Sequence, residues 1–210
     1  MGNVEGVFVM RKVTSKYFRR KYVKKNRRND NPQVIRFLES MRIKGAEEAG
    51  VKFTESHPLS KAAAFDKKFE WAKNLCNFLE DNFDDDTIKE IRMGCACGPE
   101  TGKGAKIKAI YDKEKDPYVF VQKANKLSQG FTLEYDGSSY YLIYPECYCS
   151  CVKRVSEPLP KAWCYCTLGY TKRMFENIFE QDVHVELVSS IKQGGTECRI
   201  KISFSERKDW

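Results

Sequence analysis

Apolar and polar residues alternate with a period of two through much of the C-terminal part of the chain, which predicts β-strands there. The segments 131–135 and 140–144 alternate on either side of the turn residues 136–139, as the two strands of a hairpin do. A second alternating pair, 183–191 and 198–204, flanks a turn that contains two glycines. Between these pairs, residues 167–180 repeat apolar positions at helical spacing. We therefore expect two antiparallel hairpins with one helix between them.

The first 128 residues instead space their apolar positions by three and four, which is typical of helices. One helix is expected to begin at Asn31 and Pro32, an N-cap followed by a first-turn proline, and to end near Gly45. Further helices are expected after Ser60, after the acidic run 84–86 and after Asp116-Pro117. The predicted fold class is α+β: an antiparallel sheet of two hairpins with an intervening helix, packed against a mainly helical N-terminal half.

The net charge of +8 is concentrated at the start of the 210-residue chain. Residues 1–28 hold ten Lys or Arg against the single acidic residue Glu5, whereas the remainder holds 27 basic and 28 acidic residues. We therefore divide the chain into a basic N-terminal arm (1–30), a helical part (31–128) and a sheet-plus-helix part (129–210). The last two parts are expected to form one domain.

The basic arm has two interpretations. Residues 11–28 interleave Lys and Arg with Tyr17, Phe18 and Tyr22, which suits phosphate neutralisation and base stacking, so nucleic acid is one partner to consider. A solvated amphipathic helix or arm on the surface explains the same pattern, because the apolar stripe is thin.

Seven of the nine cysteines alternate with other residues in short runs, and these runs carry the candidate chemistry. The runs are Cys95 and Cys97, then Cys147, Cys149 and Cys151, then Cys164 and Cys166. The second run follows directly on a predicted strand, and in a continued strand its three sulfurs would share one face. Core packing, disulfides and metal or redox chemistry are the three interpretations, and Cys76 and Cys198 are expected to pack in the core.

The redox state of the thiols separates these interpretations. The first residues contain no apolar stretch long enough for a signal peptide, and no segment resembles a membrane span, so we expect a soluble cytoplasmic protein. Cytoplasmic thiols stay reduced, which favours metal binding over disulfides. We assign Cys147, Cys149, Cys164 and Cys166 as principal ligands of zinc or an iron–sulfur cluster, with Cys95, Cys97 and Cys151 as reserves.

Three stretches of the chain carry a family resemblance: MGCACG (93–98), YPECYC (144–149) and the long segment from Trp163 to Phe204. Together they resemble a family of uncharacterised bacterial cysteine-rich proteins. More distantly, the Gly-containing turn before the last strand resembles L-2-amino-thiazoline-4-carboxylic acid hydrolase-like proteins and the 4-vinyl reductase domain. The resemblance implies an α+β fold that binds small molecules in sensors and in some enzymes. The hydrolase pattern does not need the extra C-x-C pairs, so no reaction is transferred with it.

Two classes of function follow. The first is a cysteine-rich metal-binding protein with a small-molecule-binding or sensing role, in which Tyr144, Tyr148 and Tyr165 supply aromatic pocket walls. The alternative is a small-molecule hydrolase that uses a cysteine thiolate or a metal-bound water. Cys166 is the candidate nucleophile, because it is expected just before a helix whose N-terminal field lowers a thiol pKa.

Overall fold

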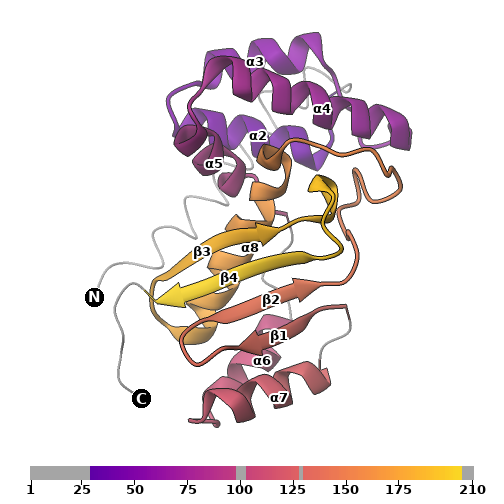
Figure 1. Cartoon of the computed structure of the whole chain (residues 1–210). Helices are drawn as coiled ribbons and strands as arrows, with labels where there is room; N and C mark the ends of the chain where they lie inside the picture. Colours follow the sequence, from indigo (N-terminus) through magenta and orange to yellow (C-terminus); the bar gives the residue numbers. More distant parts are fainter. Residues whose placement is uncertain (1–28, 98–102, 128–129, 205–210) are drawn as a thin grey trace. The chain divides into compact units, whose positions relative to one another are not determined.

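The structure is a computed structural model that describes residues 29–97, 103–127 and 130–204. The chain divides into two compact units, Met1–Cys95 and Ala96–Trp210. The fold class is α+β: the described residues form seven α-helices and one four-stranded antiparallel sheet, with a mostly helical N-terminal half (Figure 1). Within these ranges, no helix combines the length and apolar character needed to cross a bilayer. The predicted nucleic-acid contact through residues 11–28 lies outside the described residues.

The N-terminal unit consists of helices. They are α2 (Pro32–Ile43), α3 (Glu47–Ser56), α4 (Phe65–Asn82) and α5 (Asp85–Gly94). The predicted start of α2 is confirmed, because the side chain of Asn31 accepts from the Gln33 N–H. In α5, which begins within the acidic run, the side chain of Asp84 is the N-cap and accepts from the Thr87 N–H. Helix α3 was not predicted, because among its residues only Gly50, Phe53 and Thr54 are buried and the apolar pattern is sparse.

Aromatic side chains form the centre of this unit. The rings of Phe53 and Trp71 contact that of Phe37 edge-on, with centroids 5.7 and 6.4 Å away. The indole N–H of Trp71 donates to the carbonyl of His57 at 2.9 Å, and this hydrogen bond joins α4 to the C-terminal end of α3. His57 is the C-cap residue of α3.

The C-terminal unit contains the sheet and three helices. Its elements are α6 (Lys103–Tyr111), α7 (Pro117–Leu127), β1 (Thr132–Tyr135), β2 (Tyr140–Tyr144), α8 (Lys161–Phe179), β3 (Val183–Ser189), the 3-10 turn η3 (Ile191–Gln193) and β4 (Cys198–Phe204). The strand order is β1-β2-β4-β3, and each neighbouring pair is antiparallel. Both predicted hairpins are confirmed. The last strand lies between β2 and β3, so that Cys198 pairs with Tyr144.

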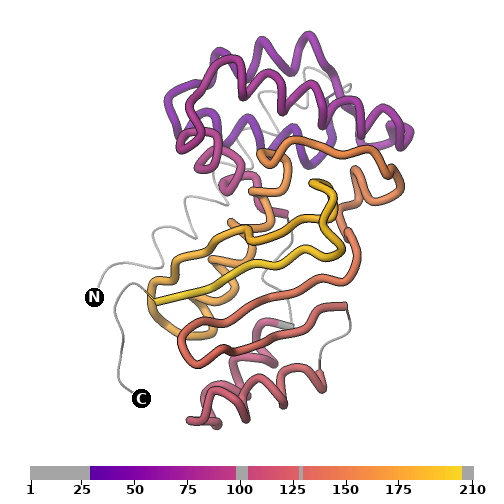
Figure 2. Tube along the Cα trace, in the orientation of Figure 1, coloured from indigo at the N-terminus to yellow at the C-terminus, as the bar shows by residue number. Residues whose placement is uncertain are grey.

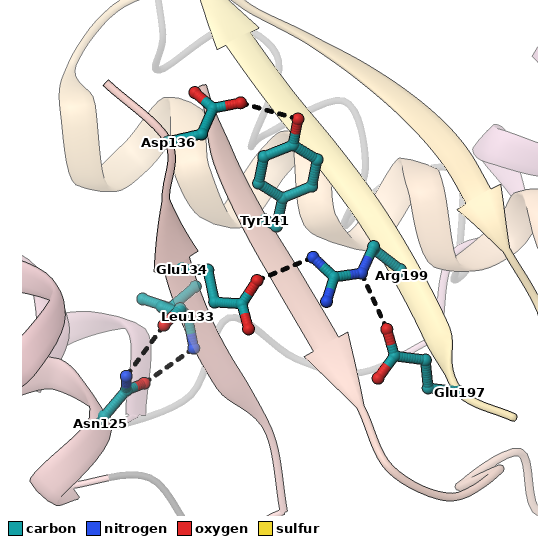
Figure 3. A network of polar contacts seen from close by, with 7 residues as sticks. All are labelled: Asn125, Leu133, Glu134, Asp136, Tyr141, Glu197 and Arg199. Atoms are coloured by element: carbon teal, nitrogen blue, oxygen red, sulfur yellow. Dashed lines mark hydrogen bonds and ion pairs between the residues drawn. The ribbon is translucent and has the colours of Figure 1, made fainter. Parts of the chain in front are cut away.

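Helix α8 packs against β3 and β4 (Figure 1). Val183, Val185 and Leu187 are buried while His184 between them is exposed, which confirms the predicted alternation of β3. Helix α7 packs beside β1, where the side-chain amide of Asn125 both donates to the carbonyl and accepts from the N–H of Leu133 (Figure 3). Helix α6, which was not predicted, packs against α7 and α8.

Two predicted boundaries near the cysteines are wrong. Strand β2 ends at Tyr144, and residues 145–160 form the irregular connection that Figure 2 traces in orange between β2 and α8. Pro145 stops the strand because it has no N–H to donate, and the chain then turns where the Val152 and Lys153 N–H groups both donate to the Cys149 carbonyl. The second run of cysteines therefore lies in a turn and not in a strand.

Helix α8 begins at Lys161 and not after Cys166. Pro160 is its N-cap residue and Ala162, Trp163 and Cys166 are its first buried positions, which is the spacing of a helical face. Both Cys164 and Cys166 therefore lie within the helix.

Candidate functional site

A cavity of about 210 Å³ lies within the C-terminal unit. Its walls come from the first half of α8, the connection that follows β2, and the adjoining ends of β3 and β4. The residues that line it are Cys97, Tyr144, Glu146, Cys147, Tyr148, Cys149, Val152, Trp163, Cys164, Cys166, Thr167, Tyr170, Leu187, Lys192 and Cys198. Six of the nine cysteines therefore border one space.

The structure brings together all four predicted principal ligands and the reserve Cys97 at this cavity. The sixth cysteine, Cys198, was expected to pack in the core, but it is only half-buried and lines the cavity. Its position at the start of β4, opposite Tyr144, places it beside the segment that carries the second cysteine run. The sequence did not show that the two hairpins pair through β2 and β4, and this pairing brings Cys198 to the cavity.

The two remaining reserve cysteines are buried. Cys151 lies in the same turn as Cys149, and its thiol donates a hydrogen bond to the Cys149 sulfur. Cys95 belongs to the N-terminal unit, where its thiol donates to the carbonyl of Ile91 at 3.2 Å. The described cysteines, which are all nine, are thiols and not disulfides.

Helix α8 and the η3 turn fix the position of Cys164. The Cys164 sulfur lies 3.1 Å from the Ser190 hydroxyl oxygen, and that hydroxyl also accepts from the Lys192 N–H at 3.2 Å. Trp163, Thr167 and Tyr170 recur at steps of four and three, so they present one face of α8 to the cavity.

Cys149 has an unusual electrostatic environment. Its sulfur accepts a hydrogen bond from the Cys151 thiol, and this lowers the pKa of Cys149 to about 6 despite its burial. The same contact raises the pKa of Cys151, because the Cys151 proton is held between the two sulfurs. The pair thus favours one thiolate and one thiol.

The neighbouring thiols behave differently. Burial raises the pKa of Cys147, and burial raises the pKa of Cys164 to about 11 in spite of the Ser190 hydrogen bond. Electrostatic interactions with the thiols of Cys198, Cys147 and Cys149 also raise the pKa of Cys164. A metal bound by them would displace protons.

Within the described residues, no three His, Cys, Asp or Glu side chains are arranged around one point as a single bound metal ion requires. The six thiols border the cavity from several sides instead. The assignment of Cys147, Cys149, Cys164 and Cys166 as metal ligands stays a prediction.

The predicted aromatic walls are present in part. Tyr144 and Tyr148 line the cavity, and Tyr170, which was not predicted, lines it as well. Burial raises the pKa of Tyr144. Tyr165 is not among the residues that line the cavity, and the Lys161 ammonium lies over its ring, 6.0 Å from the centroid. Tyr140 is buried in the aromatic core against Phe120 and Phe179.

The position predicted for Cys166, in front of a helix, is wrong. The N-terminal turn of α8 begins at Lys161, and Cys166 is buried further along the helix. The positive field of the helix N-terminus falls off within the first turn, so it does not activate this thiol. A nucleophilic Cys166 stays a prediction without that support.

Comparisons with known proteins give a family and a weak structural likeness. A family model described as "Family of unknown function (DUF6144)" matches residues 11–209, which confirms the expectation of an uncharacterised family. No curated protein matches the chain. The resemblance to thiazoline hydrolases and the vinyl reductase domain finds no support in these matches.

Two similar solved structures come from Shewanella oneidensis. The crystal structure of an H-NOX protein in the Fe(II)NO ligation state is 15% identical with a TM-score of 0.41, over 84% of this chain and 99% of that one. The NMR structure of an H-NOX domain in the Fe(II)CO state is 16% identical with a TM-score of 0.40, over 83% of this chain and 98% of that one.

Proposed function

We propose a function from the cavity itself, since the family to which this chain belongs, DUF6144, is one of unknown function. The protein binds zinc or an iron–sulfur cluster through the thiols that line the cavity. The observation that carries the proposal is that Cys97, Cys147, Cys149, Cys164, Cys166 and Cys198 line one cavity. The centre serves a binding or sensing role, in which a small molecule reaches it through the same cavity.

Thiol chemistry supports a soft metal. Thiolates are the protein ligands that zinc and iron–sulfur clusters use, whereas hard cations such as Mg²⁺ prefer oxygen. Among the described residues that line the cavity, only Glu146 carries a carboxylate, whereas six carry thiols. Thiols used only for core packing would face apolar neighbours, but Cys147, Cys149, Cys164 and Cys198 are half-buried at a cavity wall.

The size and walls of the cavity support access by a second molecule. Its volume of about 210 Å³ is several times the ~30 Å³ that one water molecule occupies in the liquid. Tyr144, Tyr170 and Leu187 provide apolar surface, and Tyr148 is 47% exposed at the edge. A mostly apolar wall with a few polar groups is typical of small-molecule sites.

Elemental analysis of anaerobically purified protein, together with an absorption spectrum, tests the proposal. We expect zinc or iron bound to the full chain. We also expect the metal to be lost from a variant in which Cys147 and Cys164 are both replaced by alanine. The matched control is Cys76→Ala, because Cys76 is buried in α4 of the N-terminal unit. Protein without metal after reconstitution with zinc, and separately with iron and sulfide, would refute the proposal.

A further inference from the structure

Building on the proposed function, we infer that the centre is a polynuclear iron–sulfur cluster held by Cys147, Cys149, Cys164 and Cys198. Cys198 takes the ligand position that sequence spacing assigns to Cys166. The inference rests on where the thiols lie around the cavity.

The spread of the thiols favours a cluster over a single zinc ion. Four thiolates at the zinc–sulfur distance of ~2.3 Å must come to within roughly 4 Å of one another. In the described residues the thiols are not arranged in this way, and they surround a cavity of about 210 Å³. In a [4Fe–4S] cluster each of the four thiolates binds a different iron, so the cysteine sulfurs stay further apart and the cluster fills the space between them.

The position of Cys198 favours it as a ligand. It begins β4 opposite Tyr144, is half-buried and lines the cavity. Its thiol interacts electrostatically with both Cys147 and Cys164. One ligand would thus come from β4, one from α8 and two from the connection after β2.

Helix geometry disfavours Cys166 as the partner of Cys164. Two residues advance the helix by a rotation of ~200°, since each residue turns it by ~100°. The side chains of residues i and i+2 therefore point in directions roughly 160° apart. The Cys164 sulfur is held 3.1 Å from the Ser190 hydroxyl, beside the η3 turn that leads into β4. Cys164 therefore lies beside the turn that leads to Cys198, whereas Cys166, which also lines the cavity, lies on a different side of the helix.

Two neighbouring groups suit an anionic cluster. Lys192 is buried, lines the cavity, and interacts electrostatically with Cys147. Trp163 also lines the cavity, and its indole N–H is a hydrogen-bond donor. Positive charge and N–H donors around thiolate ligands are the protein features that stabilise and tune iron–sulfur centres.

Reconstitution of the full chain under anaerobic conditions with ferrous iron and sulfide tests the cluster. We expect iron and acid-labile sulfide in equal amounts and a broad visible absorption that dithionite bleaches. A colourless protein that takes up only zinc would overturn the cluster but leave the proposed function intact. A protein that binds neither metal would overturn both.

Variants test the ligand assignment. Cys198→Ala is expected to abolish the visible absorption, whereas Cys166→Ala retains it, and the reverse pattern would overturn the assignment. Because Cys198 lies in a strand, the fold of each variant is checked by circular dichroism. Differential alkylation of wild-type protein is the second measurement: iodoacetamide should label Cys198 in the metal-free protein but not in the loaded one. Equal labelling of Cys198 in both forms would also overturn the assignment.

Discussion

The sulfur of Cys164 lies 3.1 Å from the hydroxyl oxygen of Ser190, and this contact joins α8 to the turn after β3. The same hydroxyl caps η3, because it accepts from the N–H of Lys192. Ser190 is buried, so both contacts are shielded from water. One side chain thus fixes a pocket thiol and the turn that carries the pocket lysine.

We expect Ser190→Ala to lower the free energy of unfolding by about 1 kcal/mol, since it removes a cap and leaves the half-buried Cys164 thiol without its hydroxyl partner. Urea unfolding followed by circular dichroism measures this. Ser189→Ala is the matched control: it removes one hydrogen bond, to the Glu197 carbonyl, and keeps the cap. An equal or larger loss in the control would show that the Ser190 contacts contribute little.

Gly94 ends α5 where that helix meets α2. A Cβ added there would lie 2.3 Å from the Ser40 hydroxyl oxygen, which donates to the Ile91 carbonyl at 2.6 Å. We expect Gly94→Ala to destabilise the protein by about 1 to 3 kcal/mol, although alanine has the higher helix propensity, because Ser40 must move and lose its hydrogen bond. Thermal unfolding measures the effect.

The matched control for Gly94 is Gly104→Ala in α6, where the new Cβ would meet Met174 at an ordinary 3.9 Å. That variant should be neutral or slightly more stable. The double variant Ser40→Ala with Gly94→Ala should recover part of the lost stability, because it removes the clashing oxygen. No recovery would place the strain elsewhere in α5.

Local signals were enough to predict most of the elements. Asn31-Pro32 and Asp84 are strong helix starts, and residues 136–139 form an unambiguous hairpin turn, so α2, α5 and the first hairpin agree with the sequence. Helices α3 and α6 were not predicted, because few of their side chains face a core. Tertiary packing decides such helices, and it is not visible in a local pattern.

The candidate site could be predicted only in part. Clustering of C-x-C pairs singled out Cys147, Cys149, Cys164 and Cys166, and all four line the cavity. Cys198 was missed because it reaches the cavity through the pairing of β4 with β2, a contact between residues far apart in sequence. The start of α8 was also missed: WCYC alternates like a strand, but Pro160 begins a helix ahead of it.

Asp136 accepts a hydrogen bond from the Tyr141 hydroxyl in the first hairpin (Figure 3), and we expect this carboxylate to make the stability of the fold depend on pH. Its carboxylate accepts from the N–H groups of Ser139 and Ser138, and from the Tyr141 hydroxyl, and these bonds hold the pKa of Asp136 well below its usual range. A carboxyl with a depressed folded-state pKa stabilises the fold above its unfolded pKa of ~3.9, and this stability is lost as pH falls through the folded pKa.

Accordingly, Asp136→Asn should melt at a lower temperature than wild type at pH 7, and the difference should shrink as pH falls below about 4. Thermal melts from pH 7 to pH 2 measure the gap. Tyr141→Phe serves as the control, because it keeps the carboxylate and removes only one donor, so its gap at pH 7 should be smaller. A gap for Asp136→Asn that is constant with pH would contradict the assigned role.

Lys192 provides the most direct test of charge at the proposed cluster. Its ammonium donates to the Val155 carbonyl, and its side chain is only 3% exposed at the cavity wall near Cys147. Thiolate ligands give an iron–sulfur centre negative charge, and reduction adds one more electron, so a nearby fixed cation favours the reduced form. Lys192→Met should therefore make the reduction potential of the loaded protein more negative, by an amount on the order of tens of millivolts.

Potentiometric titration of the reconstituted protein measures this shift. Lys192→Arg, which keeps the charge, should shift the potential less than Lys192→Met does. Lys153→Met removes an equal charge from an exposed position on the same connection, where water screens it, and should leave the potential nearly unchanged. If Lys153→Met and Lys192→Met shift the potential equally, only the overall charge of the protein matters, and Lys192 has no specific relation to the centre.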